Sequence, residues 1–533
     1  MQRMFLSLLA SWTVAGGTLD VTPKEHPRPA EVAALRAWLA EHLAQPRFAH
    51  AQWGVVIQSL DTGAELFATN EAKLFVPASN TKLFTGALAL DLLGADFRIR
   101  TSCHAAVPPD RRGRLRGDLI IHGRGDPTMA ARFHGGDIGR ALAPLVEAIV
   151  RAGVRRVDGA LIADDTYFRG PGLGSGWDWD DLSFAYAAPV SALSVNENAL
   201  SLIARPAPAA GQPALLTLEP PCSFFIVHNR VLTAPDGGRG ELTLRRALGI
   251  PAVLVEGAVP LGRTSITETV SVPWPARWFG ELLAGELKRR GVSIRKGVLE
   301  TAYPWSQAAP GHPFPPIEVA AVESPPLAEL LPLMMKPSQN LHAQLLLLQC
   351  GVAWEQRAPA GMAFATTERA GLAALTNFLA RIGVNQREVL FEEGTGLSRR
   401  NLVTPRAVVA LLRHMDTHAA AEVFGDSLPV AGRDGTLRTR MRGTVAGDNA
   451  RAKTGYVAFT YALSGYVTTR AGERLAFALL LNNYQTPDPD RPARLELDDI
   501  VVTLAGLEAR STNTLESSGQ PSARAPERSV ADP

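Results

Sequence analysis

Three short motifs, far apart along the chain, constrain its fold more than any other feature. They are S-N-T-K at residues 79–82, S-Q-N at 338–340 and K-T-G at 453–455, which match the patterns S-x-x-K, S-x-N and K-T-G. Together they provide a serine nucleophile, a lysine base, a hydroxyl that can relay a proton and a strand that can hold an anion. A single site built from all three requires a fold that brings these segments together.

The sequence around Ser79 favours this copy of S-x-x-K over a second one at 293–296. Ser79 precedes an apolar run that stops at Gly94, a pattern typical of a buried helix with glycine at its C-terminal end. Lys82, three residues on, then shares a helical face with Ser79. The other copy follows an alternating, strand-like pattern, which directs its serine and lysine to opposite faces. We interpret Ser79 as the nucleophile, with a plain helix N-cap as the alternative.

Lys82 is the natural base for Ser79, because no G-x-S-x-G elbow indicates a Ser-His-Asp site. A free lysine has a pKa of about 10.4, so catalysis near neutrality requires a drop of roughly three units. Burial and a nearby second cation both lower a lysine pKa, and Lys453 is the candidate cation. The helix dipole adds roughly 0.3 to 1 kcal/mol for a developing alkoxide.

The second motif is predicted to lie in a loop between two helices. Pro337 ends the first helix, and the mostly apolar run at 341–350 indicates the second. We expect Ser338 to relay a proton between Lys82 and the leaving amine. We expect Asn340 to hold the peptide substrate and to orient Lys82. A simple helix N-cap is the alternative interpretation of Ser338.

The third motif precedes a series of predicted strands. Residues 459–469 and 475–481 are rich in strand formers and are separated by a turn. Residues 53–58 and 65–69 form another predicted hairpin. We expect these strands in one antiparallel sheet, which brings K-T-G beside the nucleophile.

This strand edge suits the binding of a peptide with a free carboxylate. Lys453 and Thr454 are expected to bind the carboxylate, and Gly455 to let the substrate backbone approach closely. The backbone N–H groups of Ser79 and Tyr456 are expected to form an oxyanion hole.

Taken together, these residues resemble the D-alanyl-D-alanine carboxypeptidase/endopeptidase family of penicillin-binding protein 4 type, within the serine penicillin-binding protein and β-lactamase-like superfamily. The resemblance runs from about residue 54 to residue 483. Beyond the three motifs it includes G-T-G-L-S-R-R-N-L at 394–402, L-P-V-A-G-R-D-G-T-L at 428–437, G-R-G-D-P-T at 123–128 and V-S-A-L-S-V-N at 190–196.

The resemblance implies an α/β (α+β) fold, in which a β-lactamase/transpeptidase-like domain with an antiparallel sheet and helices is interrupted by a large β-rich insertion. We expect the catalytic domain over 24–96 and 318–508 and the insertion over 97–317. A Pro-rich hinge at 306–316 leads back to the catalytic domain, and residues 511–533 form a predicted disordered tail.

The resemblance also implies a serine D-alanyl-D-alanine carboxypeptidase/endopeptidase that acts on peptidoglycan stem peptides and cross-links through a Ser79 acyl-enzyme. It implies inhibition by β-lactams and no metal or organic cofactor. Asp164, Phe168 and Arg399 are implied to line the pocket for the third residue of the stem peptide. Asp165 is adjacent, so the choice of aspartate stays open, and an aspartate that merely ends a strand is the alternative.

Three departures from the family pattern stand out. The chain has E-G-T-G at 393–396 where the family usually has D-G-S-G, and Tyr456 follows K-T-G in place of serine or threonine. Ala458 replaces a residue that is often polar. Because the backbone N–H donor at residue 456 is retained, we expect the chain to be acylated. We expect the three changes to alter its substrate preference.

Composition sets further bounds. The 533 residues suffice for two or three domains, and 46% are hydrophobic, enough for sizeable cores. Lysine and arginine number 54 against 52 acidic residues, a net charge of +2, so no nucleic-acid partner is expected. The three cysteines are too few and too scattered for a disulfide scaffold or a zinc site.

The N-terminus indicates export. Arg3 precedes an uncharged stretch at 4–19 with small residues at 15–17, which predicts a signal peptide over 1–19. A buried first helix is the alternative. No other segment is long and apolar enough for a membrane span, so we expect a periplasmic protein that is soluble or peripherally membrane-associated.

Two other functions share features of this sequence. A β-lactamase shares the acylation chemistry, but the large insertion and the lack of an evident deacylating glutamate argue against it. The other alternative is a catalytically silent peptidoglycan-binding protein. In that case Tyr456 and Glu393 would indicate that the active site has degenerated. The complete set of three motifs argues against that interpretation.

Overall fold

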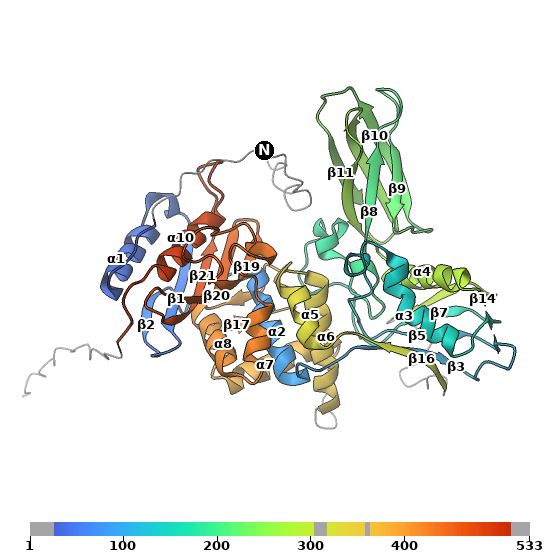
Figure 1. The fold of residues 1–533 in the computed structure, drawn as a ribbon, viewed down its shortest axis with the longest axis horizontal. Coiled ribbons are helices and arrows are strands. Elements are labelled where there is room, and N and C mark those ends of the chain that lie inside the picture. The colour runs from blue at the N-terminus through green and yellow to red at the C-terminus, as the bar shows by residue number, and fades with distance from the viewer. Residues whose placement is uncertain (1–25, 303–316, 358–362, 513–533) are drawn as a thin grey trace, which may run out of the picture.

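The computed structural model describes residues 26–302, 317–357 and 363–512 and divides them between two lobes (Figure 1). The first lobe holds both ends of the described chain, and the second lobe runs from strand β3 to strand β16. The predicted signal peptide and Pro-rich hinge lie outside the described residues. So does the predicted tail from residue 513 on, whereas the buried Ser511 hydroxyl contacts Glu473.

A five-stranded antiparallel sheet forms the centre of the first lobe, in the order β19-β20-β21-β1-β2. It contains both predicted hairpins, so the predicted sheet is confirmed. The structure adds one strand to it, because K-T-G lies within a strand of its own, β19. The five strands are β1 (Gln52–Ser59), β2 (Glu65–Thr69), β19 (Arg451–Val457), β20 (Thr460–Thr468) and β21 (Arg474–Asn482).

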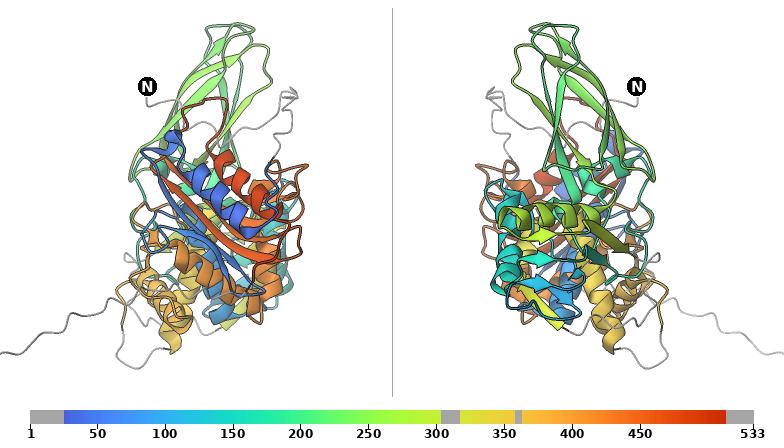
Figure 2. Two further views of the ribbon diagram at one scale, coloured as in Figure 1. Left: turned by 90° about the vertical axis from the view of Figure 1, so that its left-hand side faces the viewer. Right: turned by 90° about the vertical axis from the view of Figure 1, so that its right-hand side faces the viewer.

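Helices cover both faces of this sheet, so its central strands are buried almost without alternation. On one face α1 (Val32–Leu43) and α10 (Arg494–Ala505) lie side by side (Figure 2, left). The other face packs against helices of the core that carries the site. These are α2 (Thr81–Leu93), α5 (Leu327–Met335), α6 (Asn340–Arg357), α7 (Thr367–Arg381), α8 (Pro405–Thr417) and α9 (Ala421–Ser427), with the small hairpin β17 (Val389–Leu390) and β18 (Leu402–Val403) beside them.

Helix α2 is the buried helix that the sequence predicts after Ser79. Every residue from Thr81 to Leu90 is buried, which explains why its sequence has no polar face. The helix ends at Gly94, whose φ of 86° lies in the left-handed region that glycine adopts at helix ends.

A mixed five-stranded sheet, in the order β15-β7-β5-β3-β16, anchors the second lobe. Helices α3 (Ile138–Arg151) and α4 (Pro275–Arg289) pack against it around a separate apolar core. The strands are β3 (Arg100–Ala105), β5 (Leu119–His122), β7 (Leu161–Asp165), β15 (Val298–Ala302) and β16 (Ile317–Glu323), with a small parallel sheet of β4 (Arg114–Leu115), β6 (Arg156–Val157) and β14 (Ser293–Ile294).

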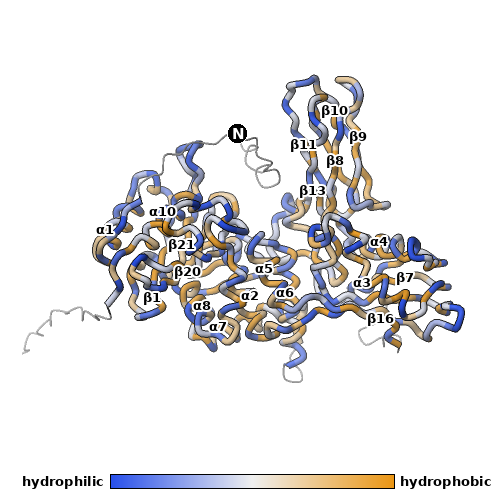
Figure 3. The backbone as a smooth tube through the Cα atoms, viewed as in Figure 1, coloured by the Kyte–Doolittle hydropathy of each residue, from blue (hydrophilic) through white to orange (hydrophobic). Residues whose placement is uncertain are grey.

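Two three-stranded sheets project from the second lobe (Figure 1, top). Apolar and polar residues mix along these strands, whereas the first lobe's sheet is more uniformly apolar (Figure 3). The sheets are β8 (Ala199–Arg205), β9 (Leu215–Glu219) and β13 (Ile266–Ser271), and β10 (Ile226–Ala234), β11 (Glu241–Arg246) and β12 (Ala252–Pro260). Within the described ranges, no helix has both the length and the apolar character that a membrane span requires.

Candidate active site

Ser79 and Lys82 adopt the predicted arrangement at the start of α2. Ser79 lies in a single 3₁₀ turn, Ala78–Asn80, that leads directly into the helix. It is half-buried, whereas Lys82 is fully buried. The Lys82 Nζ lies 2.9 Å from the Ser79 Oγ. The spacing of S-x-x-K therefore places the predicted base within hydrogen-bond distance of the predicted nucleophile.

Two further acceptors fix the Lys82 amine. Its Nζ donates to the Asn340 Oδ1 at 2.6 Å and to the Thr395 carbonyl oxygen at 2.7 Å. A neutral amine has two N–H bonds and one lone pair. Because these acceptors use both N–H bonds, the lone pair of a neutral Lys82 is left facing the Ser79 hydroxyl.

Burial makes that neutral form accessible, because it lowers the pKa of Lys82 to about 7 against the opposing charge of Glu393. Burial also lowers the pKa of Lys453 well below its ordinary value, and the charge of Lys82 lowers it further. Burial is thus the main cause of the lowered Lys82 pKa, and the two lysines repel each other, as predicted for Lys453 as a second cation.

Ser338 and Asn340 lie where α5 ends and α6 begins, as predicted. Ser338 has a φ of 63°, a left-handed conformation that is unfavourable for a non-glycine residue. Its Oγ accepts a hydrogen bond from the Lys453 Nζ at 2.8 Å. The Asn340 Nδ2 donates to the carbonyl oxygen of Tyr186, in the second lobe, at 2.8 Å.

K-T-G lies on β19, the edge strand next to the nucleophile. A Cβ added to Gly455 would lie 2.6 Å from the Pro77 carbonyl oxygen. Glycine is therefore required here by the approach of β19 to the segment before Ser79, in addition to the predicted approach of substrate. The Thr454 Oγ1 donates to the Thr436 Oγ1 at 2.8 Å, and the Tyr456 side chain is 45% exposed.

The three residues expected around the third residue of the stem peptide lie in different surroundings. The Asp164 Oδ1 accepts from the backbone and hydroxyl of Thr166, and its Oδ2 lies 3.3 Å from the His122 Nδ1. Phe168 packs into a small apolar cluster with residues of α6, and Arg399 is exposed and donates to the Ala458 carbonyl oxygen at 3.1 Å. No hydrogen bond or ion pair of the described residues links the three.

Sequence reasoning missed several groups that complete the site. The carbonyl oxygens of Thr395 and Tyr186 and the hydroxyl of Thr436 each contact a predicted residue. Glu393 was noted only as a departure, although its charge acts on Lys82. The family-like segments at 394–402 and 428–437 contain Thr395 and Thr436. The role of a backbone carbonyl oxygen, however, cannot be predicted from a sequence, because every residue has one.

One group of side chains has the composition of a metal site but not the bonding. Single ligand atoms of Asp91, His414 and His418 lie within 4.8 Å of one another. However, Arg381 already binds Asp91, and the His418 Nδ1 accepts the N–H of Ala420 at 3.0 Å. A neutral His418 then carries its proton on Nε2, the atom that faces Asp91. We assign this group no metal.

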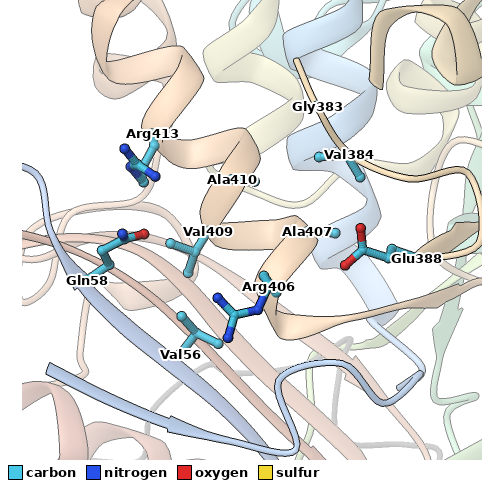
Figure 4. A pocket seen from close by; sticks show the side chains of 10 residues that line it. All are labelled: Val56, Gln58, Gly383, Val384, Glu388, Arg406, Ala407, Val409, Ala410 and Arg413. Atoms are coloured by element: carbon cyan, nitrogen blue, oxygen red, sulfur yellow. The ribbon is translucent and has the colours of Figure 1, made fainter. Parts of the chain in front are cut away.

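A cavity of about 260 Å³ between β1 and α8 is separate from the candidate site (Figure 4). Arg406, Arg413 and Gln58 surround an apolar floor that includes Val56. Ion pairs with Glu65 and Glu71 already engage Arg406. None of the predicted site residues lines this cavity.

A buried lysine bonded to a serine three residues before it, beside an antiparallel sheet, is the arrangement that serine acyl-transfer enzymes of the penicillin-binding class share. The profile of the D-Ala-D-Ala carboxypeptidase 3 (S13) family matches residues 35–503, and the chain belongs to this family. The predicted family, the carboxypeptidase class and the enzyme class are thereby confirmed.

Relatives and solved structures agree with this assignment. The chain is 35% identical to a D-alanyl-D-alanine carboxypeptidase of Actinomadura sp. (strain R39) over 473 residues, which cover 86% of this chain and 83% of that protein. It is 25% identical over 446 residues to the D-alanyl-D-alanine carboxypeptidase DacB of Haemophilus influenzae, covering 82% and 86%. The crystal structure of penicillin binding protein 4 (dacB) from H. influenzae superposes with a TM-score of 0.73 at 22% identity, covering 89% of this chain and 98% of that one. This likeness confirms the predicted fold class.

Proposed function

We propose that this D-Ala-D-Ala carboxypeptidase works through an acyl-enzyme on Ser79, with Lys82 as the base. The observation that carries the proposal is the Lys82 amine, which lies 2.9 Å from the Ser79 Oγ while its two other bonds go to fixed acceptors. Lys82 takes the Ser79 proton as the serine oxygen attacks the carbonyl between the two terminal D-alanines. Water later releases the shortened peptide and regenerates Ser79.

Ser338, held by Lys453, relays the proton toward the leaving amine. Because Lys453 donates to the Ser338 oxygen, the Ser338 hydroxyl hydrogen is free to point toward another acceptor. In the proposed path, Lys82 passes its proton through this hydroxyl to the departing D-alanine nitrogen. Asn340 holds Lys82 in place and is itself held by Tyr186.

The edge strand β19 binds the end of the substrate. Among the described residues, Val430 bridges its outer edge at Arg451, and no strand pairs with that edge from Lys453 on, where we propose that an extended peptide pairs. Thr454, with the neighbouring Thr436 hydroxyl, and Lys453 provide donors for the terminal carboxylate. We propose the N–H groups of Ser79 and Tyr456 as the oxyanion hole.

We keep Asp164, Phe168 and Arg399 as the proposed determinants of the third residue of the stem peptide. The exposed position of Arg399, bonded at the loop after β19, supports its contact with substrate. Substitution R399A should raise KM for a stem-peptide substrate and leave acylation by a small β-lactam unchanged. An equal effect on both reactions would contradict this specificity role.

We also propose the substrates, the cellular location and the domain organisation of the protein. Substrates are the stem peptides of peptidoglycan and their cross-links, so endopeptidase activity accompanies carboxypeptidase activity. The predicted signal peptide at 1–19 directs the protein to the periplasm. We propose a catalytic domain over 24–96 and 318–508 with an insertion over 97–317, and a chain that needs neither metal nor organic cofactor.

Intact mass after treatment with benzylpenicillin, for the wild type beside S79A, tests the proposal. We expect a long-lived adduct on the wild type alone, with release of D-alanine from a D-Ala-D-Ala peptide by the same preparation. Rapid consumption of the drug without an adduct would instead indicate a β-lactamase. A wild type that neither reacts with the drug nor releases D-alanine would indicate a binding protein.

A further inference from the structure

A segment of the second lobe, residues 174–187, reaches into the first lobe beside the candidate site. The Trp177 Nε1 donates to the Glu393 Oε2 at 3.3 Å, and the Ser175 Oγ donates to Glu368 at 2.5 Å. The backbone at Gly176 also lies close to side chains of the first lobe, since a Cβ added to Gly176 would lie 2.3 Å from the Ser398 Oγ. The 174–187 segment is therefore tightly packed against the residues that surround Lys82.

Glu393 receives the contact from Trp177 and is fully buried. Its Oε1 accepts from the Gly396 N–H at 2.7 Å and the Asn401 Nδ2 at 2.8 Å, and its Oε2 accepts from the Thr395 N–H at 2.7 Å. With Trp177, four N–H donors surround this carboxylate. No arginine or lysine of the described residues forms an ion pair with it, so these hydrogen bonds are what replaces the water that burial removes.

The turn that Glu393 holds is the turn that positions Lys82. The carbonyl oxygen of Thr395 accepts from the Lys82 Nζ at 2.7 Å, and that of Gly394 accepts from the Thr85 Oγ1, also at 2.7 Å. A Cβ added to Gly396 would lie only 1.8 Å from the Ala78 carbonyl oxygen. The turn therefore packs against the nucleophile segment and the first turns of α2.

We infer that Glu393 is the positioning residue for Lys82, and that Trp177 of the second lobe acts on Lys82 through Glu393. The inference rests on the proposed function of Lys82 as base. It assigns to the second lobe an indirect part in the acylation step, exerted through Glu393. The glutamate at 393, a departure from the usual aspartate, is then a working part of the site.

The pH dependence of acylation depends on the charged groups around Lys82 and Glu393. The negative charge of Glu393 raises the pKa of Lys82 against the effect of burial. Lys453 faces Lys82 from β19, and Glu368 faces Glu393 from α7; burial, and with it the charge of Glu393, raises the pKa of Glu368. Removing the Glu393 charge therefore lowers the pKa of Lys82.

The test measures the rate of acylation of the full-length chain by benzylpenicillin between pH 5 and pH 9. In E393Q the acid limb should move to lower pH by about one unit or more, the usual effect of one nearby charge. In E393D, which keeps the charge, the limb should stay in place. E368Q tests whether the limb belongs to Glu368, and it should also leave the limb in place.

A double-mutant cycle tests the route from Trp177. Substitution W177F should lower the plateau rate about threefold to tenfold, the range of one lost hydrogen bond, and should have no further effect in the E393Q background. W179F, which alters an exposed tryptophan of the same segment, is the matched control and should leave the rate unchanged.

Two results would overturn the inference: an E393Q limb at the wild-type position, or effects of W177F and E393Q that simply add. If E393Q does not fold, a W177F rate equal to that of the wild type overturns it, and a W177F loss absent from W179F supports it. A wild type that is not acylated at all means instead that the proposed function fails.

Discussion

At the scale of single residues, the site depends on the directions of the two N–H bonds and the lone pair of the neutral Lys82 amine. Asn340 and Thr395 accept the two N–H bonds, and the lone pair faces Ser79. Protonation of Lys82 fills the lone pair and removes its capacity to accept the Ser79 proton. Under the proposed mechanism, the activity therefore follows the fraction of neutral Lys82.

The wild-type acylation rate should consequently rise with pH through about 7, the pKa of Lys82. Below that value the amine is charged and the rate should fall about tenfold per pH unit, as for any base that must be neutral. Stopped acylation with benzylpenicillin between pH 5 and pH 9, read by intact mass, measures this limb. A rate independent of pH over that range would contradict Lys82 as the base.

Ser338 combines a needed hydroxyl with an unfavourable backbone, and two substitutions separate them. Both S338A and S338G remove the oxygen that Lys453 contacts, so both should lose acylation to a similar extent. Because φ is 63°, S338G should be more stable than S338A by about 1 kcal/mol. Thermal unfolding of the two variants checks this order, and equal stability would show that the backbone is not strained.

At the scale of elements, the placement of β19 against the nucleophile segment decides whether the site forms. Gly455 permits this contact, because any Cβ would meet the Pro77 carbonyl. The strand β19 pairs with β20, whereas the nucleophile segment leads into α2, so different parts of the fold hold the two segments. A change at Gly455 therefore separates the nucleophile from the carboxylate-binding strand.

G455A should lower both stability and acylation, the latter by about tenfold or more, since a displaced reacting group costs on the order of 10²-fold in rate. G425A is the control, because a Cβ at Gly425 of α9 would meet nothing within 4 Å. It should raise the stability by about 0.5 to 1 kcal/mol and leave acylation unchanged. A normal acylation rate in G455A would show that β19 tolerates displacement.

Local elements could be predicted from the sequence because their signals are local. The apolar run after Ser79, the stop at Pro337 and the alternating strands each specified an element that the structure contains. The contacts of Glu393 could not be predicted, since they join a turn to a tryptophan more than 200 positions earlier in the chain. Nor could Tyr186, which acts through its carbonyl oxygen, an atom that every residue has.

At the scale of the whole molecule, a contact of Glu197 joins the two lobes beside the site. Glu197 of the second lobe binds Arg132 of the same lobe and lies 3.0 Å from the Nε2 of His342, which is buried on α6. His342 follows Asn340 by two residues, so this contact is adjacent to the site. Burial alone would raise the pKa of Glu197, but His342 and Arg132 lower it to about 2.

A carboxylate with a lowered pKa stabilises the fold above its ordinary pKa, and this contribution is lost as the pH falls through the folded value. E197Q should therefore destabilise the protein at pH 7 by about 1.5 to 3 kcal/mol, the usual range for a hydrogen bond to a charged group, and the difference from wild type should shrink as the pH falls from 4.5 toward 2. Thermal unfolding at pH 7 and pH 3 measures it. E147Q, which breaks an exposed pair with Arg290, should change stability by less than about 1 kcal/mol. A pH-independent E197Q effect would contradict the assignment.

The dispersion of the site along the chain has a consequence for folding kinetics. Lys82 receives its contacts from residues 340 and 395, and these are braced in turn by residues 186 and 177 of the other lobe. Contacts of such long sequence separation close late, because each loop closure loses chain entropy before the contact compensates for it. Helical circular dichroism should thus recover early in refolding, while the capacity to be labelled by benzylpenicillin should appear after a lag, when the lobes have docked. The antibiotic then reports the last step of folding as well as the first step of catalysis.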